Sequence, residues 1–124
     1  MAITWFNEEK KDLIATISES NITLNKPAKN LIDYAYSVMI GLDASECKAY
    51  IKALDKESVE KGNYNKSQLY TVTIKSSYGR ISNKGYIKEI SKLLNISFDK
   101  PKKYYISYNA DEHLLEIDLS REVL

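Results

Sequence analysis

The chain repeats one pattern of elements, and this duplication limits the folds open to it more than any other feature. Residues 15–26, ATISESNITLNK, align with residues 72–84, VTIKSSYGRISNK, with one residue inserted, and both stretches end in Asn-Lys. Apolar residues at helical spacing follow each stretch, and two segments of alternating apolar and polar residues come next. We therefore predict two β-α-β-β repeats, over about residues 13–54 and 69–119, joined by a polar linker at residues 55–68.

The helix of repeat 1 has recognisable start signals. Asn25 is a favoured N-cap residue, and Pro27 fits the first helical turn because its missing N–H would have no partner there. The apolar positions that follow have the spacing of one buried helix face: Ala28, Leu31, Ile32 and Ala35. These signals predict a short helix that begins just after Asn25.

Repeat 2 carries the same signals over residues 70–94. Residues 70–75 alternate between apolar and polar side chains, as a half-buried strand does, and residues 76–79 interrupt this pattern as a kink. Ser82 and Asn83 then offer a helix cap. The predicted helix has one broad apolar stripe: Tyr86, Ile87, Ile90, Leu93 and Leu94.

A single repeat is too small to enclose a core of its own. A unit of roughly 45 residues buries too little surface on folding. Two such units can pair their strands and cover each other's sheet edges. We therefore expect one α+β domain spanning residues 1–124, a small β-barrel built from two fused β-α-β-β repeats.

The composition is that of a soluble globular protein. Of its 124 residues, 44% are hydrophobic and 28% are charged, and no apolar run is long enough to span a bilayer. The first residues do not have the pattern of a signal peptide. Cys47 is the only cysteine, which excludes an internal disulfide and predicts a cytoplasmic protein. Trp5 and Phe6, beside a charged run, indicate either a short helix or an arm that docks elsewhere.

The net charge of +1 hides an uneven distribution of charge along the chain. Residues 61–103 hold ten Lys and Arg residues against two acidic residues, while the segments on both sides have an acidic excess. The basic residues that we select as candidate nucleic-acid ligands are Lys26, Lys75, Arg80, Lys84, Lys88 and Lys92. We expect the last five on one strand-to-helix surface, where their charges would suit phosphates. The planar fork of Arg80 also suits the edge of a guanine.

The same cations have a simpler interpretation as a solvated helix face. Glu89 precedes Lys92 by three residues, so the two can pair on the helix surface. The ten tyrosines are open to two interpretations as well. Tyr64, Tyr78 and Tyr86 lie near the basic stretch and can stack on bases or fill an interface, or they are half-buried residues of a β-rich protein.

Two stretches resemble the AbrB-like swapped-hairpin domain, a family that includes SpoVT/AbrB transition-state regulators and MazE-type antitoxins. They are NITLNKPAKNLI at residues 21–32 and YGRISNKGYIKEISKLLNI at residues 78–96. The resemblance implies a swapped-hairpin barrel whose basic kink and helix start contact DNA, through Arg80, Lys84 and, by repeat equivalence, Lys26. The chain departs from the family at residues 81–84, Ile-Ser-Asn-Lys, where the family has Val-Val-Ile-Pro. Repeat 1 also lacks the Gly-Arg pair.

Few residues have the chemistry of an enzyme. His113 is the only histidine, and Cys47 has no histidine near it in the sequence to act as its base. Glu116 and Asp118 share one face of a predicted strand, where they would hold a hard cation weakly at most or simply face solvent. The sequence has no phosphate loop, zinc pattern or nucleophile elbow. We therefore expect neither catalytic residues nor a metal or other cofactor.

The leading prediction is a DNA-binding transcriptional regulator whose partner is double-stranded DNA. The alternative is a non-enzymatic protein-interaction module, antitoxin-like or an inhibitor, in which the acidic last hairpin or the Trp5–Phe6 arm grips a protein partner. Neither prediction involves a membrane. Both are compatible with a monomer or a homodimer.

Overall fold

The computed structural model describes residues 2–3 and 12–124, and its main element is one antiparallel sheet of eight strands. Trp5 and Phe6, the residues of the predicted arm, lie outside the described residues. The strands follow one another in the sheet in the order β3-β4-β8-β7-β1-β2-β6-β5. Their bounds are β1 Ile14–Ile17, β2 Asn21–Leu24, β3 Ser37–Asp43, β4 Lys48–Leu54, β5 Thr73–Ile74, β6 Gly79–Ser82, β7 Lys102–Asn109 and β8 Leu114–Glu122.

Three short α-helices accompany the sheet in the described residues, and two of them begin at the predicted caps. They are α1 at Lys26–Leu31, α2 at Lys56–Glu60 and α3 at Lys84–Leu94, with a 3₁₀ turn at Lys66–Gln68 between α2 and β5. Asn25 Oδ1 accepts the N–H of Ala28 at 3.3 Å, and Asn83 Oδ1 accepts the N–H of Tyr86 at 2.9 Å. Both predicted N-caps are therefore confirmed. No described helix has the length and apolar character that a membrane crossing requires.

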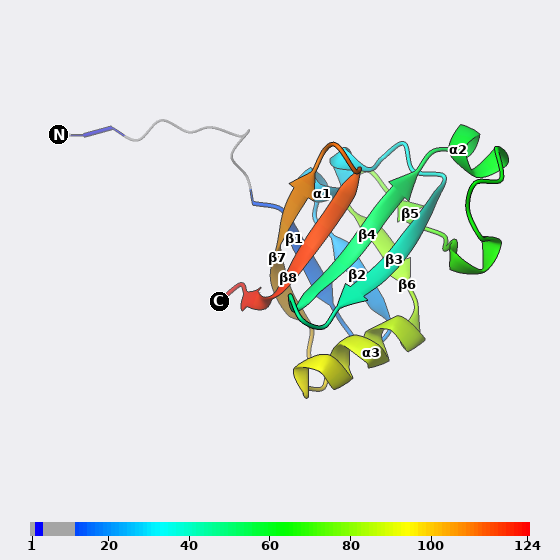
Figure 1. Ribbon diagram of the computed structural model, residues 1–124. Coiled ribbons are helices and arrows are strands. Elements are labelled where there is room, and N and C mark those ends of the chain that lie inside the picture. The colour runs from blue at the N-terminus through cyan, green and yellow to red at the C-terminus, as the bar shows by residue number, and fades with distance from the viewer. Residues whose placement is uncertain (1, 4–11) are drawn as a thin grey trace.

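The sheet curls into a half-barrel, with α1 and α3 at opposite ends of it (Figure 1). Alternate residues of the strands point inward, so the core is a single cluster of aliphatic side chains: Ala15, Ile17, Ile22, Leu24, Ile51, Ile81, Leu115 and Ile117 among others. From α3, Ile87 and Ile90 add to this core, and both are almost fully buried. A mainly antiparallel, curled sheet with short helices agrees with the predicted α+β class.

The two edges of the sheet approach each other at one point. Val38 of β3 and Tyr70, which precedes β5, exchange two backbone hydrogen bonds of 2.9 Å and 2.8 Å. Among the described residues this bridge is the only backbone pairing between the two edges. The backbone pairing between β1 and β7 is more extensive than this bridge, because it includes four residue pairs.

The structure corrects the predicted element order. Each half was expected to begin with one kinked strand, but in each half that segment is a hairpin of two strands, β1–β2 and β5–β6. A tight turn reverses the chain at the kink predicted in repeat 2, where the N–H of Lys75 donates to the carbonyl of Tyr78 at 2.8 Å. The equivalent turn of repeat 1 is closed by the N–H of Ser18, which donates to the carbonyl of Asn21 at 2.9 Å. Each half is therefore ββαββ. The polar stretch at residues 55–68 contains α2, capped by Asp55.

Tyr70→Pro tests whether the backbone bridge closes the sheet. The substitution removes the N–H that donates to the carbonyl of the fully buried Val38, so we expect a loss of about 2–3 kcal/mol in the free energy of unfolding. Tyr70→Ala keeps that N–H and should cost less than about 1 kcal/mol. Urea denaturation of both variants makes the comparison. An equal loss in the two would assign the effect to the tyrosine side chain and not to the bridge.

Candidate nucleic-acid interface

The outer face of the β2–β6 strand pair is polar throughout. Thr23 lies opposite Arg80 and Asn21 lies opposite Ser82, and the residues that alternate with them face the core. The Ser82 Oγ atom donates a hydrogen bond to Asn21 Oδ1 at 2.6 Å, which links the two strands on the solvent side. Arginine, asparagine, serine and threonine are the side chains that commonly read base edges in DNA.

This polar face continues across the neighbouring strands as a row. Pairing registers connect five residues side by side, one from each of β7, β1, β2, β6 and β5: Lys103, Thr16, Thr23, Arg80 and Thr73. Each of the five is exposed or half-buried, whereas Ile17, Leu24 and Ile81 beside them are buried. The row therefore forms a polar, basic stripe on the outside of the curled sheet. It holds no aspartate or glutamate.

Arg80 is the side chain in this row with the most defined surroundings. Its guanidinium carbon lies 5.0 Å from the centroid of the Tyr78 ring, a cation–π contact that restricts its conformations. Arg80 also lines a shallow hollow of about 410 Å³ together with Tyr70, Thr73 and Ser82. Among the described residues no carboxylate forms an ion pair with Arg80. Its charge is thus free for a ligand.

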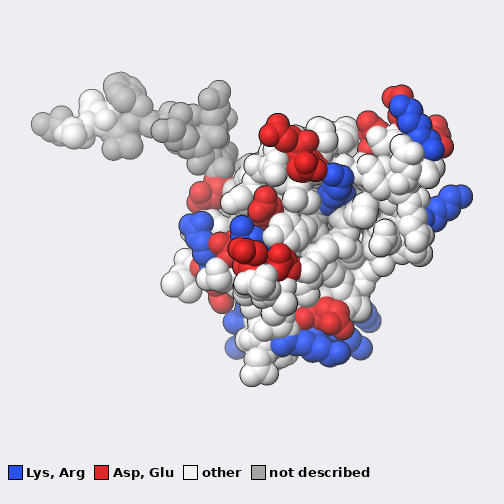
Figure 2. Space-filling model, in the orientation of Figure 1, with Lys and Arg blue, Asp and Glu red and all other residues white. Residues whose placement is uncertain are grey.

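Charges of opposite sign gather on different parts of the protein. Residues 20–32 and 70–88 contain no Asp or Glu, carry six Lys and Arg residues between them, and are joined through β2 and β6. The β4–β8 side instead carries acidic residues, of which Glu116 pairs with Lys48 at 3.4 Å. Figure 2 views the protein from the β4–β8 side, with acidic side chains over β8 and basic ones along α3. The basic residues of the two acid-free segments are therefore brought together by the pairing of β2 with β6.

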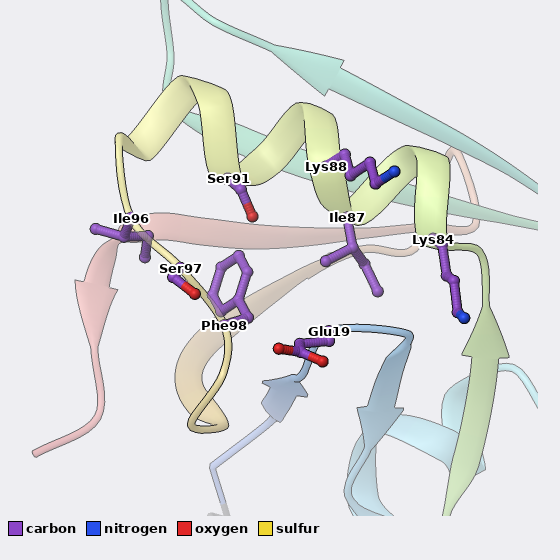
Figure 3. A pocket seen from close by; sticks show the side chains of 8 residues that line it. All are labelled: Glu19, Lys84, Ile87, Lys88, Ser91, Ile96, Ser97 and Phe98. Atoms are coloured by element: carbon purple, nitrogen blue, oxygen red, sulfur yellow. The ribbon is translucent and has the colours of Figure 1, made fainter.

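The six predicted ligands do not all lie in one place. Lys84 and Lys88 line a groove of about 490 Å³ between α3 and the β1–β2 turn. In Figure 3 the ring of Phe98 lies between α3 and Glu19, which comes from the β1–β2 turn. Arg80 lines the separate hollow on the sheet, and Lys75 lies in the β5–β6 turn.

The other two predicted ligands have different surroundings. Lys92 is paired with Glu89 at 3.5 Å, as expected from their spacing. Lys26 begins α1, at the opposite end of the curled sheet from α3 (Figure 1). Of the other four, Arg80 and Lys75 lie on the β5–β6 hairpin, and Lys84 and Lys88 lie on α3 beside a separate groove. None of these four forms an ion pair with a described residue.

Four residues of the polar face were missed in the sequence: Thr16, Asn21, Thr23 and Lys103. The sequence contained a weak indication for Thr23 alone. Residues 22–24, Ile-Thr-Leu, alternate between apolar and polar side chains, and this alternation places Thr23 on the solvent side. Nothing in the sequence showed that β2 would lie beside β6, since the two strands are almost 60 residues apart. The missing information was the pairing of distant strands.

Tyr86 anchors α3 to the sheet and is not a free stacking platform. Its hydroxyl donates to the carbonyl oxygen of Gly41 at 2.5 Å and lies 3.4 Å from that of Tyr50. Burial raises the pKa of Tyr86 well above its usual range, because the charged phenolate would lose its hydration. The α3 lysines are thus presented by a helix that is fixed to β3 and β4.

The residues considered for enzymatic chemistry are dispersed. His113 is exposed, and its ring meets Tyr34 edge-on at a centroid distance of 5.9 Å. Asp118 accepts hydrogen bonds from Ser120 through Oδ1, whereas Glu116 faces Lys48. Within residues 2–3 and 12–124, no three His, Cys, Asp or Glu side chains are grouped as metal ligands would be.

Tyr86→Phe tests the anchoring of α3. The variant loses a buried hydrogen bond, so we expect the free energy of unfolding to fall by about 1 kcal/mol at pH 7. Because the pKa of Tyr86 is higher in the folded state, the stability that this shift contributes is fully present below pH 10.0, the pKa of the unfolded state. This stability is lost as the pH rises above that value. The gap in the free energy of unfolding between the wild-type protein and the variant should therefore narrow above pH 10.0. Urea denaturation at several pH values measures the gap, and one that stays constant would contradict this role.

The geometry on its own is the basis for assigning a function. Comparisons with protein-family models, with curated proteins and with solved structures find no match to the chain. The AbrB-like resemblance therefore rests on the two stretches quoted above, at residues 21–32 and 78–96.

Proposed function

We propose that the protein is a DNA-binding regulator that holds a duplex against the outer face of β2 and β6. The observation that carries the proposal is the pairing of two segments, residues 20–32 and 70–88, which contain six Lys and Arg residues and no acid. Lys29 is buried, but the other five cations are exposed, and exposed cations attract the phosphate backbone of DNA and release its counterions.

The outer face of β2–β6 carries polar side chains of the kinds that contact DNA. The pair lies inside the eight-stranded sheet, with β1 and β5 on its two sides, so the duplex would lie across the outer face of the sheet. Arg80 would read a base edge, because its guanidinium can donate two hydrogen bonds to a guanine. Lys75, Lys84 and Lys88 would hold phosphates and fix the orientation of the protein on the duplex.

The strand order supports assignment to an AbrB-like swapped-hairpin barrel. The β1–β2 hairpin pairs on both sides with strands of the other half, β7 and β6, and with neither strand of its own half that follows α1. The resemblance to the AbrB-like family implies a hairpin that is exchanged between the two halves in this way. The family's DNA contacts at the basic kink and helix start would then correspond to Arg80 and Lys84, with Lys26 at the equivalent place in the first half.

A salt series of duplex binding tests the proposal. The affinity of the wild-type protein for a random-sequence duplex should fall linearly on a log–log plot against salt concentration. The triple variant Arg80→Ala, Lys84→Ala, Lys88→Ala should bind more weakly at every salt concentration. Its slope should fall by about 0.9 for each phosphate contact that is lost. Fluorescence anisotropy of a labelled duplex measures both quantities.

A charge-matched variant controls for the change in net charge. Lys56→Ala, Lys61→Ala, Lys66→Ala removes three cations from the segment between β4 and β5, outside the β2–β6 pair, and should keep the wild-type slope. The proposal fails if the wild-type protein does not bind at low salt, or if both triple variants weaken equally. Failure to bind would favour the protein-interaction alternative.

A further inference from the structure

The two halves of the chain can be matched residue by residue at their first hairpins. The β1–β2 turn closes with a bond from Ser18 N–H to the Asn21 carbonyl, and the β5–β6 turn with the same bond from Lys75 to Tyr78. Matching the two turns makes Thr23 the counterpart of Arg80. Burial agrees, because the next residue in each strand points into the core.

These counterparts lie directly opposite each other. In the β2–β6 register, Thr23 pairs with Arg80. On either side of them, Ile22 pairs with Ile81 and Leu24 pairs with Gly79. Leu24 is the counterpart of Ile81, and Ile22 is the counterpart of Gly79. Replacing each residue of the pair Ile22–Ile81 by its counterpart in the other half therefore gives the pair Gly79–Leu24. This is the arrangement produced by a two-fold axis between Thr23 and Arg80.

The opposite side of the curled sheet has the same relation. Cys47 and His113 end equivalent turns with positive φ angles of 55° and 53°. The carbonyl of Cys47 accepts the N–H of Leu119 at 3.0 Å, and that of His113 accepts the N–H of Ala53 at 3.1 Å. Leu119 and Ala53 each lie six residues after the corresponding turn residue, so the two bonds are equivalent. Matching these turns makes Tyr50 the counterpart of Glu116, and the two again lie opposite each other.

We propose that an approximate two-fold axis relates the two halves, and that one copy of the chain binds an asymmetric DNA site centred on this axis. The inference rests on the proposed DNA-binding function. The phosphate backbone of B-DNA is itself two-fold symmetric, so both halves can hold it. Lys26 and Lys84 are counterparts, each at the first helical position after an asparagine cap.

The bases, however, are read from one half only. Arg80 supplies a guanidinium for a guanine near the centre of the site, whereas Thr23 places a short uncharged side chain at the equivalent position. A bidentate arginine–guanine contact discriminates against other bases by about ten- to a hundredfold. The target therefore has a preferred guanine in one half-site and no matching preference in the other.

Selection from a randomised duplex pool tests this inference. The wild-type protein should yield a non-palindromic consensus with a guanine preference on one side, and native mass spectrometry should show one chain per duplex. Thr23→Arg should add the guanine preference on the second side and raise affinity for the symmetrised site by about tenfold or more. Arg80→Thr should lose the guanine preference while keeping salt-dependent binding.

Thr16→Arg is the matched control for added charge. Thr16 lies beside Thr23 in the same outward row but away from the axis, so this variant should raise affinity for all duplexes without making the consensus palindromic. Thermal unfolding checks that each variant folds, and the wild-type consensus decides the question even if Thr23→Arg does not fold.

The outcomes separate this inference from the function on which it rests. If the wild-type protein binds no duplex at low salt, the proposed function fails and the inference fails with it. If the wild-type protein binds but selects a palindrome, binds as two chains, or selects no base at all, the inference is wrong while the proposed function stands.

Discussion

The pairing of β2 with β6 is the contact on which the rest of the structure depends. Four residue pairs join a strand of the first half to a strand of the second and complete the continuous sheet. Gly79 of β6 packs under α1 and beside β5, where a Cβ atom would lie in ordinary contact with Lys29 Cγ at 3.4 Å and Ile74 Cδ1 at 3.6 Å. A side chain longer than that of alanine would have to displace one of these neighbours.

The same pairing brings two basic segments together. The acid-free segments at residues 20–32 and 70–88 are far apart in the chain, and they become neighbours only because β2 pairs with β6. On the β4–β8 side, Lys48 and Lys52 face Glu116 and Glu112 at 3.4 Å and 3.5 Å. Exposed pairs of this kind add little stability, so their main effect is on the electric field around the protein.

Local signals in the sequence predicted local structure well. The caps Asn25 and Asn83 and the pair Glu89–Lys92 depend on residues three or four positions apart, and the structure has all of them. The hairpin β1–β2 was missed because its turn, Ser-Glu-Ser, has neither the Gly nor the Pro that marks most reversals. The outward row of five residues was beyond sequence reasoning, since its members are brought together by registers between distant strands.

The union of both halves in one polypeptide has a thermodynamic consequence. A barrel assembled from two separate chains falls apart on dilution, because its stability includes a term in protein concentration. Here the residues at 55–68 hold the second half close to the first, so the β2–β6 and β4–β8 contacts form within one molecule. The formation of these two contacts therefore carries no term in protein concentration. Each half is also free to change its surface residues independently of the other, which two identical chains cannot do.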